Sequence, residues 1–192
     1  TEKEIPCLWF NYEVSPEEFF ERFGEKVPYF FLPRKLKNSS IEWVKHRILE
    51  GVAKFNTKVI FLDHLHFLLD MNDLAKAKNV SLLIGMLMRD LKRIALETKT
   101  IIFLVSHMKK NQLEKTPTTE DLRDSSFVAQ ESDIVMMMWR HKEKNSESPT
   151  GYIYTNESRI IISKNRRTGK LGYVKLLLKY GRFTELTENN YG

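Results

Sequence analysis

Cysteine is almost absent from this sequence, and several features that would indicate a special class of protein are missing as well. Cys7 is the one cysteine among 192 residues, which excludes an internal disulfide and is compatible with a reducing compartment. No apolar run approaches the roughly 20 residues of a membrane-spanning helix. The chain does not open with a charged segment followed by an apolar one, so nothing predicts secretion. These absences favour an ordinary soluble domain.

The composition is that of a globular protein with a modest basic excess. Hydrophobic residues make up 42% and charged residues 29% of the chain, enough for a real core, and the length favours a single domain. The net charge of +6 is a weak indication of a polyanionic partner. Because the chain begins at Thr1 and not at a methionine, we expect a fragment or a processed product.

Short apolar runs alternate with helix signals. Ser15-Pro16-Glu17-Glu18 reads as a capping box that starts a helix, and Ser39-Ser40 starts a second one. A third, long helix is expected from Leu83. Strands are predicted at residues 7–12, 59–62 and 101–106, of which the last two are expected to be buried, with a further apolar run at 134–139.

The last third of the chain has a different pattern. Residues 140–155 are polar and are expected to form a mobile excursion, and residues 159–163 form a strand followed by a basic turn and two more short strands. Strands that alternate with helices predict a mostly parallel α/β sheet flanked by helices. Strands without intervening helices predict added antiparallel strands at the C-terminal end.

Four polar residues follow predicted strands directly: Glu13, Asp63, His107 and Lys164. Ligands of open α/β sheets bind at the carboxyl ends of the strands, so these side chains are candidates for a site. Val59 to Asp63 has the form of the Walker B strand of P-loop nucleotide hydrolases, whose aspartate helps to hold Mg²⁺. A buried strand that ends in a capping aspartate gives the same pattern. Glu13 is a candidate base for activating water, or a residue that only braces the helix behind it.

Five segments, in order along the chain, are similar to motifs of one family. They are CLWFNYEVS from Cys7, Leu62-Asp63-His64 with Leu65, Ser106-His107-Met108-Lys109, Asp121-Leu122-Arg123-Asp124-Ser125 with Gln130 and Asp133, and Lys164-Asn165-Arg166-Arg167-Thr168-Gly169 with Gly172. Together they resemble the RecA-like motor domain of hexameric replicative DNA helicases. This family includes DnaB-type helicases, phage primase–helicases and the mitochondrial helicase Twinkle.

The resemblance implies a role for each matched residue. Glu13 would be the catalytic base and Asp63 the acid linked to Mg²⁺. His107 and Gln130 would sense the γ-phosphate of ATP or another NTP. Lys164 and Arg166 would reach the nucleotide of a neighbouring subunit. The role of Arg123, fold support or DNA contact, stays open.

The family places DNA-contacting loops where this chain has polar stretches, at residues 70–80 and 108–120. These stretches carry five candidate DNA-binding lysines: Lys76, Lys78, Lys109, Lys110 and Lys115. The alternative is that these lysines lie on solvated loops. Few aromatic residues accompany them, so contact with the DNA backbone is a better interpretation than base stacking.

One family motif is missing. The family requires a G-x-x-x-x-G-K-[ST] loop upstream of the first matched strand, where backbone amides and a lysine bind phosphates. Neither Gly24-Glu25-Lys26 nor Gly169-Lys170 has this spacing. We expect truncation before Thr1, with the matched part beginning near Cys7. A degenerate domain that does not use ATP is the alternative.

The sequence therefore predicts one RecA-like domain over residues 1–192, from a helicase that translocates on single-stranded DNA during replication. Implied partners are single-stranded DNA, identical subunits in a hexameric ring and a primase, with no membrane. The implied location is a bacterial or phage-infected cytoplasm or the mitochondrial matrix. Two alternatives stay open: an inactive RecA-like module that binds DNA or a helicase, and a recombinase-type ATPase.

Overall fold

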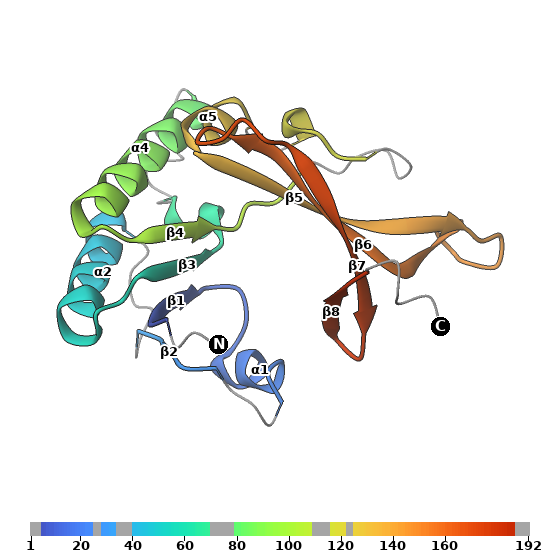
Figure 1. Ribbon diagram of the computed structural model, residues 1–192, viewed down its shortest axis with the longest axis horizontal. Coiled ribbons are helices and arrows are strands. Elements are labelled where there is room, and N and C mark those ends of the chain that lie inside the picture. Colours follow the sequence, from blue (N-terminus) through green and yellow to red (C-terminus); the bar gives the residue numbers. More distant parts are fainter. Residues whose placement is uncertain are drawn as a thin grey trace. The chain divides into compact units, whose positions relative to one another are not determined.

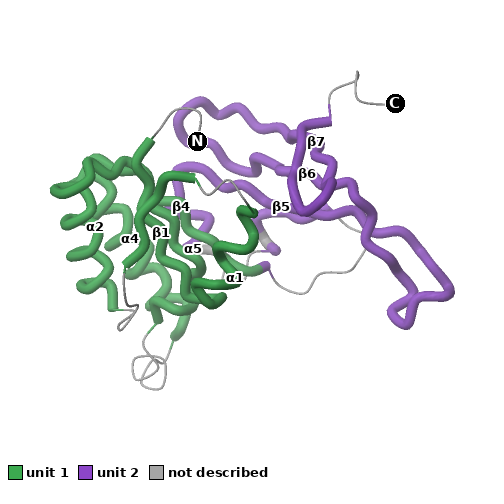
Figure 2. Tube along the Cα trace, turned by 90° about the horizontal axis from the view of Figure 1, so that it is seen from below, with its two compact units in different colours: residues 1–107 green, residues 108–192 purple. Residues whose placement is uncertain are grey.

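The computed structural model describes residues 5–24, 28–33, 40–69, 79–108, 116–121 and 125–186. The chain divides into two compact units, Thr1–His107 and Met108–Gly192 (Figure 2). The single-domain organisation stays a prediction. No helix in the described ranges is long and apolar enough to cross a membrane.

The first unit is built on a parallel sheet (Figure 1). Its strands lie in the order β2-β1-β3-β4 and all neighbouring pairs are parallel. Their bounds are β1 Cys7–Asn11, β2 Phe30–Phe31, β3 Val59–Asp63 and β4 Ile101–Leu104. Because all strands run in the same direction, their carboxyl ends meet at one edge of the sheet.

Within the described residues, three α-helices lie between these strands, and each begins at a side-chain cap. They are α1 Pro16–Glu21, α2 Ile41–Phe55 and α4 Val80–Thr98, and a short 3-10 helix, η1, spans Leu65–Leu68. The side-chain oxygens of Ser15, Ser40 and Asn79 accept a hydrogen bond from a backbone amide in the first turn, which satisfies one of the free donors there.

Alternate residues of β1 pack against different helices. Leu8 and Phe10 are buried, and Phe10 contacts Trp43 of α2 edge-to-face at 6.0 Å between ring centroids. Trp9 points to the opposite face, where it stacks on Phe61 at 4.6 Å and contacts Phe19 of α1 at 5.0 Å. The two-residue period of a strand therefore explains why helices cover both faces of this sheet.

The second unit contains a helix and an antiparallel sheet. The helix α5 spans Ser125–Glu131, and a short 3-10 helix, η2, at Thr119–Asp121 precedes it. The strands are β5 Ile134–Lys144, β6 Tyr152–Asn165, β7 Gly172–Lys179 and β8 Arg182–Glu185, paired in that order. All three pairs are antiparallel.

The predicted fold class is confirmed: a parallel sheet flanked by helices, followed by antiparallel strands. The expectation of a mobile excursion at residues 140–155 is wrong, because β5 and β6 continue through it as a hairpin. Tyr154 in this hairpin lies under two cations, the Arg140 guanidinium at 5.3 Å and the Lys142 ammonium at 4.4 Å. These cross-strand contacts stabilise strands whose polar sequence gives no apolar alternation.

The expectation that residues 101–106 form a buried strand is also wrong. Ile101, Phe103 and Val105 are exposed, whereas the residues between them are less so. β4 is the edge strand of the described sheet, and its exposed residues alternate along the strand, so they share one face that no described element buries. The region still forms a strand at the predicted place.

We expect Ile48→Ala to lower the free energy of unfolding of the first unit by about 2–5 kcal/mol, because Ile48 is fully buried and its truncation leaves a cavity. The matched control is Leu49→Ala on the same helix, where the side chain is 43% exposed, with an expected change of roughly 0.5 kcal/mol or less. Urea unfolding of both variants measures the difference. Equal losses of unfolding free energy in the two variants would contradict the burial of Ile48 and the exposure of Leu49.

Candidate functional site

The carboxyl ends of β1, β3 and β4 bring three of the predicted site residues together. Asn11 and Asp63 are register partners, and the Tyr12 amide donates a hydrogen bond to the Asp63 carbonyl oxygen at 2.9 Å. Glu13 therefore follows immediately beside the end of β3. His107 follows β4, and its ring lies 4.2 Å from that of His64. This edge of the sheet is the candidate site.

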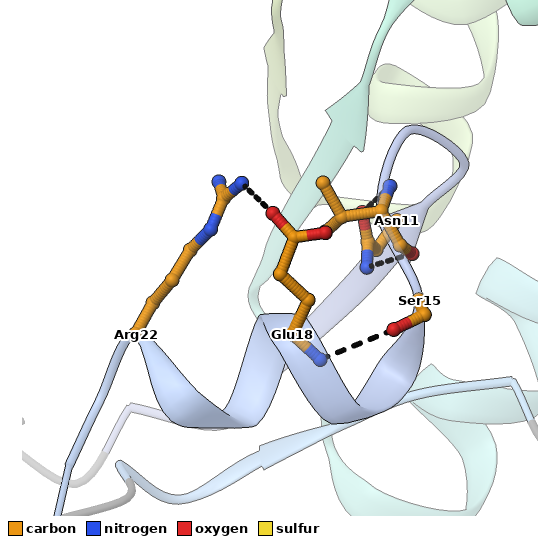
Figure 3. Close-up of polar contacts among 5 residues, drawn as sticks. Asn11, Ser15, Glu18 and Arg22 are labelled. Atoms are coloured by element: carbon orange, nitrogen blue, oxygen red, sulfur yellow. Dashed lines mark hydrogen bonds and ion pairs between the residues drawn. The ribbon is translucent and has the colours of Figure 1, made fainter.

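A short turn fixes the backbone that carries Glu13. The Asn11 side chain is 7% exposed, and its carboxamide donates to the Val14 carbonyl at 3.0 Å and accepts from the Val14 amide at 3.4 Å. The hydroxyl of Ser15 then caps α1 (Figure 3). Asn11 thus closes a loop around Glu13 from one side while the helix cap holds it from the other. The Glu13 side chain itself is exposed.

The expected capping box at this helix is only half formed. The Glu18 amide donates to the Ser15 hydroxyl at 3.2 Å, as predicted. The Glu18 carboxylate instead accepts from the Arg22 guanidinium at 2.8 Å, one helical turn further along (Figure 3). Charge attraction at this spacing competes with the return bond to the cap.

Asp63 lies in an environment that disfavours its negative charge. Partial burial raises the pKa of its carboxyl, and the nearby negative charge of Glu13 raises it further. His64, Arg22 and His107 act in the opposite direction and lower the pKa of Asp63, but they do not cancel the increase. Two carboxylates that repel one another at a strand edge would gain from a cation between them or a proton on one of them.

Three histidines lie near this edge. Burial lowers the pKa of His64, as does the neighbouring His107, so the neutral imidazole is favoured. The His66 ring centroid lies 5.5 Å from that of His64. In the described part of the chain, no group of three or more His, Cys, Asp or Glu side chains could hold a metal ion by itself. Mg²⁺ does not require such a group, since it commonly binds one or two carboxylates together with substrate phosphates.

Buried polar atoms that have no hydrogen-bond partner among the described residues gather at the same strand ends. They are the Tyr12 hydroxyl, the Ser106 hydroxyl and Nδ1 of His64. Phe67 contacts two of these residues: its ring centroid lies 5.9 Å from that of Tyr12 and 4.9 Å from that of His64. Buried polar groups are normally bonded, so these three atoms lack the partners that a fold usually supplies. The fit of this edge to a metal–nucleotide complex rests on the neighbouring Glu13 and Asp63 carboxylates.

The other three predicted site residues belong to the second unit, where they form one cluster. The Lys164 ammonium donates to the carbonyls of Ala129 and Gln130 at 2.6 and 2.8 Å. The Arg166 guanidinium donates to the same Gln130 carbonyl at 2.8 Å and lies 3.6 Å from the Asp133 carboxylate. Both cations thus bind the C-terminal end of α5, where free carbonyls and the helix dipole favour positive charge.

The remaining predicted residues fall outside the ranges that the structure describes. They are the five lysines Lys76, Lys78, Lys109, Lys110 and Lys115, together with Arg123. Their roles stay predictions. Sequence reasoning missed Asn11 and Arg22, which brace Glu13 and act on Asp63. An asparagine two residues before an acid, followed by a helix start, is the signal that could have found the first of them.

The fold and the site define a class. Parallel strands flanked by helices, with two acids and a histidine at the carboxyl ends, fit the RecA-like fold that the sequence predicts. Residues 28–186 match the family described as the DnaB-like helicase C-terminal domain. The chain belongs to this family.

Individual relatives agree with this assignment. A probable replicative DNA helicase of Trieres chinensis is 23% identical over 90% of this chain and 44% of its own length. The replicative DNA helicase DnaB of Pasteurella multocida (strain Pm70) is 31% identical over 58% of this chain and 24% of its own. The chain thus spans less than half the length of these curated relatives.

Solved structures share the fold. A DnaB-like replicative helicase, described with its interactions with primase, superposes with a TM-score of 0.76 and 20% identity over 97% of this chain and 51% of that one. A second solved structure, that of an ATPase domain, gives the same TM-score and identity over 97% of this chain and 76% of that one. The RecA-like helicase fold is therefore confirmed.

We expect Asp63→Asn to increase the free energy of unfolding at neutral pH. The pKa of Asp63 is raised in the folded state, so the folded chain binds a proton more tightly than the unfolded chain does. The stability that this tighter proton binding gives is fully present below pH 3.8, the ordinary pKa of an aspartate. It is lost as the pH rises through the raised pKa of Asp63. The asparagine variant avoids this loss, so its advantage should be small at pH 3 and larger at pH 7.

Chemical unfolding between pH 3 and 7 measures this difference. Glu21→Gln, which removes an exposed acid at the end of α1, is the control and should show no such trend. An advantage for Asp63→Asn that is constant with pH, or a loss of stability at pH 7, would contradict the description of the Asp63 environment.

Proposed function

We propose that this chain is the motor part of a replicative DNA helicase, which hydrolyses ATP or another NTP to translocate on single-stranded DNA. The observation that carries the proposal is the convergence of Glu13 and Asp63 at one sheet edge beside His107, in a member of the DnaB-like family. Neither the charge repulsion nor the unpartnered polar atoms there benefit the fold. Both suit a site that receives Mg²⁺ and phosphates.

The residues divide the chemistry between them. Glu13 orients a water molecule and takes its proton, which its exposed carboxylate on a braced turn can do. Asp63 would hold the Mg²⁺ ion. When bound, Mg²⁺ would neutralise phosphate charge and polarise the phosphoryl group under attack. His107 lies beyond the end of β4, at the same sheet edge. Together with Gln130, it senses whether the γ-phosphate is present.

The second unit supplies charges to a neighbouring subunit in this proposal. Lys164 and Arg166 act on the phosphoryl group bound by an adjacent copy, so hydrolysis requires assembly, in a hexameric ring. Within the chain both side chains hold carbonyls at the end of α5, including that of Gln130. Movement of either cation toward a phosphate would release these carbonyls. This link would connect nucleotide state at the subunit boundary with the backbone of a sensor residue.

The phosphate-binding loop is the part that this sequence does not contain. The proposal therefore includes a segment encoded before Thr1 that supplies G-x-x-x-x-G-K-[ST]. Absence of such a segment from the encoded protein would favour the inactive RecA-like module. A primase or zinc-ribbon domain in that segment would favour the helicase over a recombinase-type ATPase. Single-stranded DNA and a primase are the proposed partners, in a bacterial or phage-infected cytoplasm or the mitochondrial matrix.

Mixing two inactive variants tests whether catalysis is shared between subunits. In the full encoded protein, Glu13→Gln should abolish turnover and leave nucleotide bound, because only the carboxylate that activates water is lost. Arg166→Ala should lower DNA-stimulated hydrolysis about 10³–10⁵-fold, the typical value of an arginine finger. When the two are mixed, sites with an intact Glu13 gain neighbours with an intact Arg166, and part of the activity should return.

Arg167→Ala is the matched control, since Arg167 lies in the same turn and its loss should leave hydrolysis near wild type. Subunit exchange is verified independently, by energy transfer between labelled copies. If exchange occurs and no activity returns, Arg166 acts within its own subunit or not at all, and the ring motor loses its main support.

A further inference from the structure

One face of the antiparallel sheet carries aromatic rings and basic groups side by side. Trp139 of β5 lies directly opposite Arg159 of β6, which lies directly opposite Lys175 of β7. The Arg159 guanidinium carbon lies 5.4 Å from the Trp139 ring centroid and 5.2 Å from that of Tyr173. Residues opposite one another share a sheet face. We call these four residues the aromatic–basic face.

No ion pair among the described residues neutralises the positive charges of this face, although Arg159 contacts the two rings. Within the described part of the chain, neither the Arg159 guanidinium nor the Lys175 ammonium has an ion pair. A small hollow on the face is lined by both of them, by His141 and by one acid, Glu157, among others. Cations that stand together on a surface without an acid to neutralise them indicate an anionic partner.

The geometry of Arg159 suits phosphate. Its planar guanidinium is held between two rings, so little conformational entropy is lost when its N–H groups bind an anion. Charge-assisted, bidentate contacts with phosphate oxygens are the strongest that an arginine makes. Lys175, one strand further along, adds a second positive charge at the spacing of neighbouring strands.

The aromatic residues suggest what else the anion carries. Tyr173 is 57% exposed, so its ring contributes little to a core and one side of it is open to a ligand. Sheets that bind single-stranded nucleic acid present aromatic rings beside basic groups, with bases stacked on the rings and phosphates on the cations. An acidic protein surface would use the cations and leave the ring faces in water.

We propose that the aromatic–basic face binds single-stranded nucleic acid, with phosphates on Arg159 and Lys175 and a base on Tyr173. This site is distinct from the lysines expected at residues 70–80 and 108–120. It requires neither nucleotide hydrolysis nor the roles given to Glu13 and Arg166, so it can fail or succeed independently of the proposed motor function.

Binding of a fluorescein-labelled oligo-dT to the full encoded protein, without nucleotide, tests the stacking. Tyr173→Leu should weaken binding roughly 5- to 150-fold, the usual effect of losing one stacked base. Tyr173→Phe keeps the ring and should bind nearly as tightly as wild type. Circular dichroism verifies that each variant is folded.

The salt dependence tests the phosphate contacts. Replacing both Arg159 and Lys175 with alanine should flatten the slope of log affinity against log salt by about 1.4, at roughly 0.7 per phosphate on a single strand. Arg167→Ala removes the same kind of charge from the turn after β6 and should leave the slope near its wild-type value. Photo-crosslinking with 5-iodouracil DNA should label Trp139 or Tyr173.

Three results would overturn the proposal. The first is wild-type affinity of Tyr173→Leu together with no crosslink on β5 to β7. The second is an equal loss for Tyr173→Leu and Tyr173→Phe, which would exclude stacking. The third is unchanged DNA binding with weaker self-association in sedimentation, which would make this face a contact between copies of the chain.

Discussion

Two carboxylates, those of Glu13 and Asp63, lie at the same edge of a sheet because β1 and β3 run parallel with Asn11 beside Asp63. In a parallel sheet, the residues that follow the strands all lie at this one edge. Burial, and then repulsion from Glu13, raise the pKa of Asp63, and both work against folding. A fold that keeps such a pair, and braces one member through the Asn11 turn, holds charge ready for a cation. The histidine after β4 completes the edge.

The second unit depends on a different electrostatic arrangement. Its helix α5 has only seven residues, and two cations, one near the end of β6 and one in the turn that follows, bind its last carbonyls. A short helix gains much of its stability from tertiary contacts of this kind, because it is too short to be stable by itself. In the proposed motor, Lys164 and Arg166 would therefore have two possible partners, the helix end and a phosphate of another subunit. Competition between these partners would link helix position to nucleotide state.

The parts of the fold that could be predicted are those with a local signal. Ser15 and Ser40 mark helix starts, and the apolar run before Asp63 identifies a buried strand. The motif order then identifies the family. By contrast, the β5–β6 hairpin has polar residues on both faces beyond Trp139, so hydropathy gives no period-two pattern, and its contacts join residues far apart in the sequence.

The candidate site was predictable to the same degree. Strand ends located Glu13, Asp63 and His107, because parallel topology follows from the alternation of strands and helices. The hydrogen bonds of Lys164 to carbonyls 34 and 35 residues earlier could not be predicted, since only the folded backbone brings them together. The bracing role of Asn11 depends on loop dihedrals that the sequence alone leaves undetermined.

The most direct test of the central claim is a crystal structure of the full encoded protein with Mg²⁺ and a non-hydrolysable ATP analogue. The account predicts the metal, or one of its waters, on the Asp63 carboxylate, and a water within hydrogen-bond distance of Glu13 that faces the γ-phosphate. A nucleotide bound away from the carboxyl ends of β1 and β3, or a Glu13 side chain turned away from the phosphates, would contradict it.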